Sequence, residues 1–516
     1  MTDALFLGLD VGSSSTKGVL VDASGRTEAV VELPHTISRP RTGWAEQDAE
    51  RDWWDSVAEA CRRLSAGRAA RVTAVGICGL GPCLLPADGD GLPLRPAILY
   101  GIDTRAREQI ERLTAELGAD EILARCGSVL SSQSVGPKLR WLAEREPKVW
   151  AAARHVFGAG SYLVFRLTGE YVLDHHSASH WAPLYDVSRN EWIGEWSDVV
   201  ASGLALPRLV WPHETSGRLS REAAAATGLP EGIPVAGGTI DSWAEVAASG
   251  LRGPGEGLLV YGTSMFVTEV HTPARLDRRL WGTVGFAPGA LNVAAGVGSA
   301  GALMAWLREL TGGASFDELY EEAAGAGPGA GGLLALPYFA GERAPLFDPD
   351  LRGALLGLTA AHGRGHLFRA LLEATAFAVR QDLETMGEAG ATISRLRSSG
   401  GGTSDPLWPQ IVSDVTGLAQ EVRYGGSGAG VGAAFFAAVA AGAATLADAW
   451  PAPGATVEPC VALRETYDEL YAQYRGLAQA TLLQAHALAG WQRHRGWSGE
   501  HGGSRGHPGQ SGDVPD

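Results

Sequence analysis

The chain has 516 residues and a formal net charge of -16 at pH 7. This length exceeds what a single hydrophobic core usually supports, so we expect two domains. The acidic balance argues against nucleic acid and anionic membranes as partners, although backbone amides and helix N-termini can still bind nucleotides. The five cysteines form no C-x-x-C pair, so we expect reduced thiols. We find neither a basic leader nor an apolar run of membrane-spanning length, and we therefore expect a cytoplasmic protein.

Two similar segments, 5–22 and 257–270, lie about half the chain apart. Each consists of an apolar run rich in β-formers, a turn of glycine and hydroxyl residues, and a second apolar run, which is typical of a tight hairpin. In both turns the small side chains leave backbone N–H groups free to face an anion. The pattern therefore predicts an α/β protein with two lobes that hold a polyphosphate between them.

The rest of the chain alternates predicted strands with predicted helices. The expected strands are 28–33, 72–78, 96–100 and 234–240, and the expected helices lie around 53–61, within 104–160, and at 300–310, 373–383 and 407–416. The Gly- and Pro-rich stretch 250–255 is the best boundary between the halves. It divides the chain into an N-terminal domain at 1–249, a C-terminal domain at 250–490, and a tail at 491–516 that we expect to be disordered because it lacks periodicity.

Two carboxylates stand at the ends of predicted strands. Asp10 ends a hydrophobic strand, where an uncompensated charge is costly, so we expect a cation or a phosphate–metal complex beside it. Asp241 follows an apolar strand and opens a predicted helix, which allows two interpretations. It either caps the helix N-terminus, where Asp is favoured, or acts as the general base in a phosphoryl transfer.

Three other motifs each have two interpretations. The turn 12–17 resembles a P-loop but lacks its Gly-Lys-Ser/Thr ending and joins two strands, so a plain polar turn is the alternative. The segment 428–433 fits the dinucleotide fingerprint G-x-G-x-x-A, but no βαβ unit with a placed acidic residue follows, which favours helix packing through small residues. His176 and His180 share a helix face without a nearby Cys or Glu to complete a metal site, so we interpret them as pocket-lining residues.

Five stretches between about Leu7 and Ala441 resemble, in order and in spacing, the motifs of the FGGY family of carbohydrate kinases. They are Leu9-Asp10-Val-Gly-Ser-Ser-Ser-Thr-Lys17, Gly43-Trp-Ala-Glu-Gln-Asp48 with Trp53-Trp54, Pro137-Lys-Leu-Arg-Trp-Leu142, Gly341-Glu-Arg-Ala-Pro345 continuing to Glu373, and Gly400-Gly-Gly402 with Pro406-Leu-Trp408. The resemblance implies an α/β fold of two ribonuclease-H-like or actin-like ATPase domains. The active site would lie in the cleft between the domains, which close over ATP, Mg²⁺ and a sugar.

The resemblance also implies roles for individual residues. Asp241 falls on the family's catalytic base, and Asp10 on the acidic residue associated with magnesium and phosphate. The residues expected to bind ATP come from both halves: Gly12, Ser13, Ser14, Ser15, Lys17, Gly262, Thr263, Gly301, Gly401, Gly402 and Asp405. Those expected to bind the substrate are Gly81, Pro82, Asp103, Asp241 and Ser242.

One loop departs from the family pattern. After the strand 72–78, xylulose kinases of the family carry Gln-Met-His and glycerol kinases an Arg-Glu pair, whereas this chain has Gly79-Leu-Gly81-Pro82-Cys83. Because Gly81 and Pro82 offer no side-chain donor or acceptor, the loop argues against a glycerol kinase and also counts against a standard D-xylulose kinase. A second segment keeps its Asp103 and Arg105 but has Tyr100 in place of the family's tryptophan.

We therefore predict an ATP- and Mg²⁺-dependent kinase that phosphorylates a primary hydroxyl of a small ketose or polyol, most simply a pentulose, with Asp241 as the general base. A sugar acid or an unusual polyol is the alternative substrate. An actin- or chaperone-like ATPase, or a nucleotide-binding regulator without sugar transfer, is the alternative from a different class, because one fold supports several functions. We expect no nucleic-acid or membrane partner, and the resemblance allows a homodimer.

Overall fold

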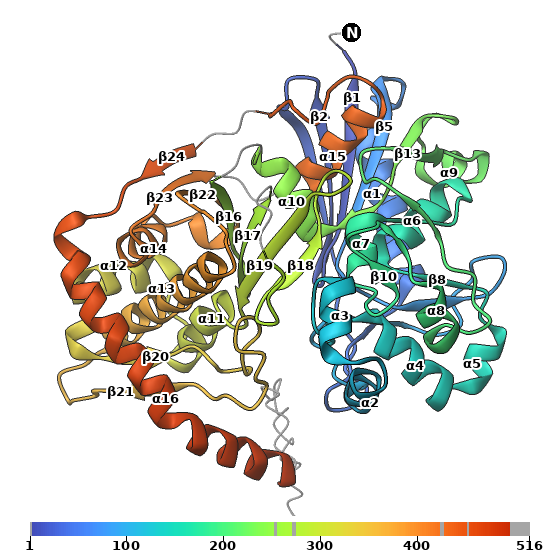
Figure 1. Ribbon diagram of the computed structural model, residues 1–516. Helices are drawn as coiled ribbons and strands as arrows, with labels where there is room; N and C mark the ends of the chain where they lie inside the picture. Colours follow the sequence, from blue (N-terminus) through green and yellow to red (C-terminus); the bar gives the residue numbers. More distant parts are fainter. Residues whose placement is uncertain (1–2, 252–254, 271–274, 424–427, 451–453, 496–516) are drawn as a thin grey trace, which may run out of the picture.

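The computed structural model describes residues 3–251, 255–270, 275–423, 428–450 and 454–495. Two seven-stranded sheets organise these residues, one in each half of the chain (Figure 1). Two helices, α10 (Asp241–Ser249) and α15 (Gly428–Ala440), pack against each other and lie between the sheets. The two halves therefore meet along a helical layer.

The first sheet has the strand order β13-β14-β5-β1-β2-β3, and β15 also pairs with β5. β1 lies in its middle, antiparallel to β2 and parallel to β5. All but one residue of β1 are buried, as expected for a central strand that is covered on both faces. The strands are β1 (Leu5–Val11), β2 (Ser15–Asp22), β3 (Thr27–Pro34), β5 (Val72–Gly79), β13 (Thr215–Arg218), β14 (Pro234–Ala236) and β15 (Thr239–Ile240).

Side chains of β1 alternate between the two faces of the first sheet. Leu5, Leu7 and Leu9 belong to a hydrophobic cluster with residues of α1 (Ser56–Ser65) and α6 (Ala159–Thr168). Phe6 belongs to a different cluster, which includes residues of α10 and α15. The same alternation places Asp10 on the face of α10 and α15, where the second half of the chain lies.

The rest of the first half forms helices and four short two-stranded sheets, which pair β4 with β7, β6 with β8, β9 with β12 and β10 with β11. The elements are β4 (Glu46–Gln47), η1 (Ala49–Asp55), η2 (Ala69–Arg71), β6 (Leu85–Ala87), β7 (Ala97–Ile98), α2 (Arg107–Leu117), α3 (Ala119–Cys126), α4 (Val135–Arg145), α5 (Pro147–Ala152), β8 (His155–Phe157), β9 (Val172–Asp174), α7 (His175–Ser179), β10 (Tyr185–Asp186), β11 (Glu191–Trp192), α8 (Gly194–Val200), β12 (Arg208–Val210) and α9 (Arg221–Thr227).

The second sheet repeats the arrangement of the first, with the order β18-β19-β17-β16-β22-β23-β24. Its hairpin strand β16 is antiparallel to β17 and parallel to β22, as β1 is to β2 and β5. The strands are β16 (Glu256–Tyr261), β17 (Met265–Val270), β18 (Trp281–Val284), β19 (Leu291–Val297), β22 (Arg395–Ser399), β23 (Ala419–Arg423) and β24 (Gly454–Val457).

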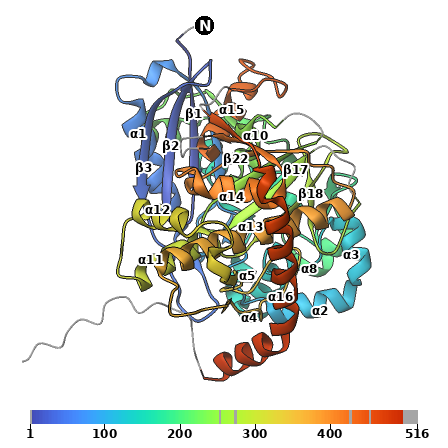
Figure 2. The ribbon, with the colours of Figure 1, turned by 90° about the vertical axis from the view of Figure 1, so that its left-hand side faces the viewer.

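The second sheet is covered by long helices. The longest, α16, runs along the outside of this half, past α14 and β20 (Figure 2). The elements are α11 (Gly301–Leu310), α12 (Phe316–Ala326), η3 (Ala330–Gly332), β20 (Leu334–Leu336), β21 (Ala354–Leu356), α13 (Arg364–Glu388), η4 (Gly401–Thr403), α14 (Leu407–Thr416), η5 (Val461–Leu463) and α16 (Arg464–His494). Within the described part of the chain, no helix combines the length and the apolar character that crossing a membrane requires.

Both predicted hairpins are confirmed, as β1–β2 and β16–β17. The prediction of a mainly helical stretch was wrong at 155–157, because these residues form β8 and pair with β6. The predicted tail was wrong at its start: α16 continues to His494, and its end is held by a hydrogen bond of 2.7 Å from Arg352 to Gln492. Residues 496–516 lie outside the described residues, as do 252–254 in the predicted boundary. The division at 249 and 250 stays a prediction.

Candidate active site

A cavity of about 360 Å³ lies where the two halves meet. The turns of both hairpins border it, together with the ends of strands from both sheets. Its polar lining comes from the first half with Asp10, Ser13, Tyr100, Gln133, His176, His180, Asp241, Ser242 and Glu245, and from the second half with Thr263, Ser264, Thr268, Thr283, Asn292 and Arg343. Gly81, Pro82 and Gly262 also border the cavity.

The two hairpin turns are closed in a similar way, although the first spans residues 12–15 and the second the shorter stretch 262–264. The Gly12 N–H donates to the Ser15 carbonyl at 2.9 Å, and the Gly262 N–H donates to the Ser264 carbonyl at 3.1 Å. Ser13 and Thr263, which follow these glycines, line the cavity from opposite halves. A group with several acceptor oxygens, such as a phosphate, fits between two such turns because each turn presents backbone N–H groups.

The register of the first sheet brings Asp10 and Asp241 to one edge. β5 lies between β1 and β15, and Cys78 of β5 is opposite both Asp10 of β1 and Thr239 of β15. Neighbouring strands lie about 5 Å apart, so β1 and β15 are separated by roughly twice that distance. Asp241 follows β15 directly, and both carboxylates line the cavity.

Asp241 is the first residue of α10, and Ile240 occupies the N-cap position. Its Oδ1 accepts a hydrogen bond of 2.7 Å from the Ser242 N–H. The N-cap interpretation was therefore wrong about the position, although the carboxylate does accept one backbone N–H group at the helix start. Because Asp241 also lines the cavity, it is available to a ligand.

Burial shifts the protonation of three carboxylates around the cavity. It raises the pKa of Asp241 to about 7, and the charge of Asp10 adds to the shift. It raises the pKa of Asp10 to about 6, where the charge of Glu245 adds to it, and that of Glu245 to about 7. A cation bound among these groups would oppose each shift, because an opposite charge favours the ionised form.

His176 and His180 also line the cavity, which confirms their interpretation as pocket-lining residues. Burial lowers their pKa values to about 3 and about 4, so both rings are neutral at pH 7. His176 stacks on Trp243 at 4.2 Å between ring centroids, and its Nδ1–H donates to the Val284 carbonyl at 2.9 Å. Within the described ranges, no group of three His, Cys, Asp or Glu residues is arranged to hold a metal ion.

Comparison with known proteins identifies the family. Residues 5–248 match the N-terminal domain of the FGGY family of carbohydrate kinases, and residues 257–441 match its C-terminal domain. The chain belongs to this family. It is therefore a carbohydrate kinase, an ATP-dependent sugar phosphotransferase, as the motifs predicted.

Relatives and solved structures of FGGY kinases agree with this assignment. The kinase is 31% identical to a xylulose kinase from Klebsiella pneumoniae, over 84% of this chain and 90% of the relative. It is 30% identical to a glycerol kinase from Nocardia farcinica, over 84% of this chain and 89% of the relative. The crystal structure of xylulose kinase from Rhodospirillum rubrum matches with a TM-score of 0.84 and 32% identity, covering 93% of this chain and 100% of that one. The predicted two-domain α/β fold is confirmed.

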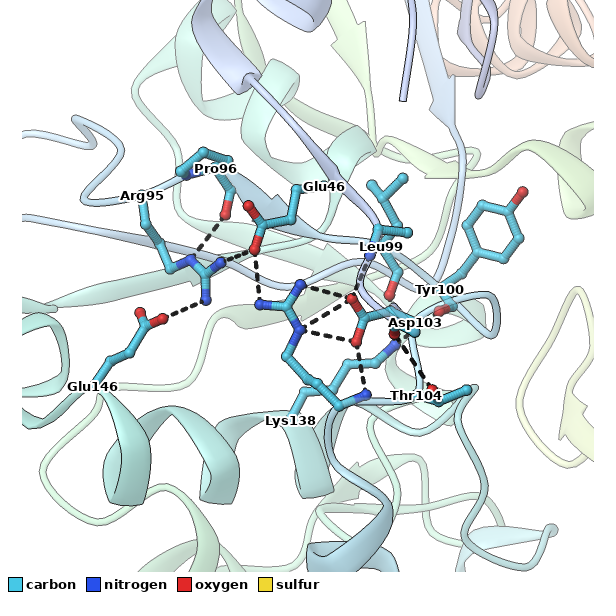
Figure 3. A network of polar contacts seen from close by, with 12 residues as sticks. Glu46, Arg95, Pro96, Leu99, Tyr100, Asp103, Thr104, Lys138 and Glu146 are labelled. Carbon is cyan, nitrogen blue, oxygen red and sulfur yellow. Dashed lines mark hydrogen bonds and ion pairs between the residues drawn. The ribbon is translucent and has the colours of Figure 1, made fainter. Parts of the chain in front are cut away.

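One predicted substrate residue of the kinase, Asp103, does not line the cavity. Its side chain is fully buried, pairs with Arg105 at 2.7 Å, and accepts the Ala45 N–H at 2.7 Å. Figure 3 shows Asp103 inside a polar network, with the Tyr100 ring pointing away from it. Lys138 belongs to this network and donates to the Tyr100 carbonyl at 3.2 Å. As a correction, Asp103 holds the loop in place, and the residue of this loop that lines the cavity is Tyr100.

Several predicted ATP residues also lie outside the cavity lining. They are Gly12, Ser14, Ser15, Lys17, Gly301, Gly401, Gly402 and Asp405. Ser15 donates to Glu32 at 2.7 Å, and Lys17 pairs with the same carboxylate at 3.6 Å. Gly301 packs behind the second turn, where its N–H donates to the Gly262 carbonyl at 3.0 Å.

Three of the residues expected to bind ATP, Gly401, Gly402 and Asp405, lie in the segment between β22 and α14. Asp405 accepts the Leu407 N–H at 2.8 Å, which supports the start of α14. Gly402 packs closely against Trp408, while the space beside Gly401 is open. Their contact with a nucleotide stays a prediction.

Sequence reasoning missed Gln133, Glu245 and Arg343 as cavity residues, and it named Tyr100 without a role. Glu245 had a local signal, because residues four apart share one face of a helix and Asp241 opens α10. Arg343 belongs to the motif Gly341-Glu-Arg-Ala-Pro345, but nothing local indicated a role for its side chain, because its loop reaches the cavity only through the fold.

Proposed function

We propose that this kinase transfers the γ-phosphoryl group of ATP to a primary hydroxyl of a pentulose, with Asp241 as the general base. The observation that carries the proposal is that Asp241 shares one cavity with Asp10 and with both hairpin turns. A base must lie within hydrogen-bond reach of the hydroxyl, and its pKa works best near the operating pH. Burial raises the pKa of Asp241 to about 7, which meets the second condition.

In the proposed reaction, Asp241 accepts the proton of the sugar hydroxyl as that oxygen attacks the γ-phosphorus. The bond from the γ-phosphorus to the bridging oxygen of ADP breaks, so the products are the sugar phosphate and ADP. The turns with Ser13 and Thr263, which line the cavity, orient the transferring group through backbone N–H groups. Closure of the two halves over the ligands would exclude water as a competing acceptor. Phosphoryl transfer depends mainly on such positioning and on charge stabilisation.

Asp10 fits a Mg²⁺ ion. Its carboxylate is buried at the cavity, and its one recorded side-chain hydrogen bond within the described chain is a weak contact of 3.7 Å from the Cys78 thiol. Mg²⁺ prefers oxygen ligands and uses one or two carboxylates together with substrate phosphates. The ion would supply positive charge to the phosphates, which lowers the repulsion that the attacking oxygen meets.

A small sugar suits the size and lining of the cavity. Ligand pockets usually span about 300 to 1,000 Å³, and this one, at about 360 Å³, lies at the small end. Tyr100, Gln133 and His180 offer polar groups to sugar hydroxyls, while Gly81 and Pro82 offer none from their side chains. The similarity to xylulose kinases supports a five-carbon ketose among the small sugars.

We further propose that the nucleoside of ATP binds on the second half, near Gly301, Gly401, Gly402 and Asp405. The loop that carries the last three follows the carboxyl end of β22, which is parallel to β16. Ligands of open α/β sheets bind in crevices outside the carboxyl ends of parallel strands. The open space beside Gly401 leaves room for a flat ring.

The test is ADP release from Mg-ATP, measured with and without pentuloses, hexuloses, polyols and sugar acids. We expect sugar-dependent release with a pentulose, and Asp241→Asn should lower turnover by about 1,000-fold because general bases contribute 10²–10⁴-fold. Asp198→Asn, an exposed change on α8, is the matched control and should have normal turnover. Full activity of Asp241→Asn would refute the assignment of Asp241 as the base. ADP release at the same rate with and without every sugar would indicate an ATPase. ADP release that rises only with sugar acids would show that the substrate is a sugar acid and not a pentulose.

A further inference from the structure

Arg343 lines a cavity whose other charged side chains, among the described residues, are acidic. Of the described residues that line the cavity, Asp10, Asp241 and Glu245 are carboxylates and Arg343 is the single lysine or arginine. Its Nη1–H donates to the Ser264 hydroxyl at 3.5 Å, and no carboxylate in the described ranges forms an ion pair with it. A half-buried guanidinium that has no anionic partner among the described residues is costly, so an anionic ligand would complete the site.

The surroundings of Arg343 indicate where that anion lies. Ser264 belongs to the turn of the second hairpin. Tyr100, from the first half, lines the same cavity; burial raises its pKa, the charge of Asp241 adds to the shift, and the charge of Arg343 opposes it. Ser13, in the turn of the first hairpin, lines the same cavity. The guanidinium therefore contacts the second turn and shares one cavity with the first turn and with Asp241.

The backbone of Arg343 is held firmly. One carboxylate oxygen of Glu342 accepts the Gly298 N–H at 2.6 Å and the Arg343 N–H at 2.8 Å. The neighbouring Ala344 carbonyl accepts the Gly296 N–H at 3.2 Å, which fixes the loop to β19. Because the Glu342 contacts go to backbone groups, the Arg343 guanidinium stays available to a ligand. A positive charge that is already in position before the reaction stabilises the transition state without any reorganisation of the protein during the reaction.

We propose that Arg343 is a catalytic residue that binds the transferring phosphoryl group and stabilises its charge in the transition state. This inference rests on the proposed function, since it assigns the anion between the two turns to the γ-phosphoryl group of ATP. A guanidinium presents a planar set of donors that matches two phosphate oxygens at once. An arginine that performs this role in other phosphoryl transferases raises turnover by a large factor.

The first test compares Arg343→Met and Arg343→Lys with the parent kinase at saturating sugar and Mg-ATP. We expect Arg343→Met to lower kcat by about 100- to 1,000-fold, as the loss of one transition-state donor does, with the KM for sugar nearly unchanged. Arg343→Lys keeps the charge but not the planar donors and should retain an intermediate kcat. Arg308→Met, an exposed change on α11 in the same half, is the matched control. Added guanidinium should partly restore Arg343→Ala.

The second test needs no turnover and separates this inference from the proposed function. We expect Arg343→Met to bind a non-hydrolysable ATP analogue about tenfold more weakly than the parent does, because a charge-assisted hydrogen bond to the γ-phosphate is lost. ADP binding should stay unchanged. Equal loss for ADP and the analogue, or a raised sugar KM with normal kcat, would overturn the inference. If the parent phosphorylates no sugar, but Arg343→Met still binds the ATP analogue more weakly than the parent while binding ADP equally well, the proposed substrate is refuted. The assignment of Arg343 to the γ-phosphate would then stand.

Discussion

Replacing Gly432 by alanine should disrupt the contact between α10 and α15 and, through it, the active site. A Cβ atom on Gly432 would lie 1.7 Å from the Ala244 carbonyl oxygen of α10. α15 is equally close to the first sheet on its other side, since a Cβ on Gly76 of β5 would lie 1.8 Å from the Ala433 carbonyl oxygen. The helix therefore has no space on either side into which it can move.

The loss of stability in Gly432→Ala follows from this geometry. Side-chain Cβ atoms essentially never approach a non-bonded atom closer than 3.0 Å, so the two helices would have to separate by more than about 1 Å. Overpacking usually lowers the free energy of unfolding by about 1–3 kcal/mol. A side chain that clashes with the backbone of a neighbouring helix should reach at least the top of that range, about 3 kcal/mol. Because α10 begins with Asp241, a shift of this size should also lower kcat by about 100-fold.

Chemical denaturation and sugar-dependent ADP release would measure the two effects on the same preparation. Gly476→Ala is the matched control, since Gly476 lies in α16 and a Cβ atom there would meet no neighbouring atom within 4 Å. Alanine there should raise the free energy of unfolding by about 0.5–1 kcal/mol, because glycine is the poorer helix former. If Gly432→Ala has the same free energy of unfolding and the same turnover as the parent kinase, the close packing of α10 and α15 is refuted.

Two further predictions concern pH and a buried ion pair. We expect kcat/KM to fall as the pH drops through about 7 and then more steeply below about 6. The reason is that burial raises the pKa values of Asp241 and Asp10, and both carboxylates must be ionised to act. A kcat/KM that stays constant between pH 5.5 and 8 would contradict this prediction. Glu373→Ala should lower the free energy of unfolding by about 3–5 kcal/mol in a denaturation experiment, because it leaves the buried Arg369, 2.7 Å away, without its charged partner. Glu322→Ala removes a partly exposed partner of Arg364 and should lower the free energy of unfolding far less than Glu373→Ala does. Equal losses in the two variants would show that burial does not decide how much each ion pair contributes to stability.

Local patterns in the sequence were sufficient to predict the framework of the site. The alternation of apolar residues and the Gly/Ser/Thr turns identified both hairpins, and the end of a strand identified Asp10 and Asp241 as unusual carboxylates. The small residues at 428–433 were also interpreted correctly, since α15 packs through Gly432 against α10. These features depend on the backbone of a few consecutive residues, and their physical requirements are therefore visible in a short window of sequence.

The tertiary structure alone decided which side chains enter the cavity. Asp103 and Tyr100 lie on the same loop, but Asp103 turns into a buried network with Arg105 while Tyr100 lines the cavity. Arg343 reaches Ser264 and the surroundings of Asp241 from a loop that is distant in sequence, and His155–Phe157 becomes a strand because β6 is there to pair with it. The direction of a side chain and the partner of a strand depend on packing between segments far apart in the chain, so no local pattern of residues carries that information.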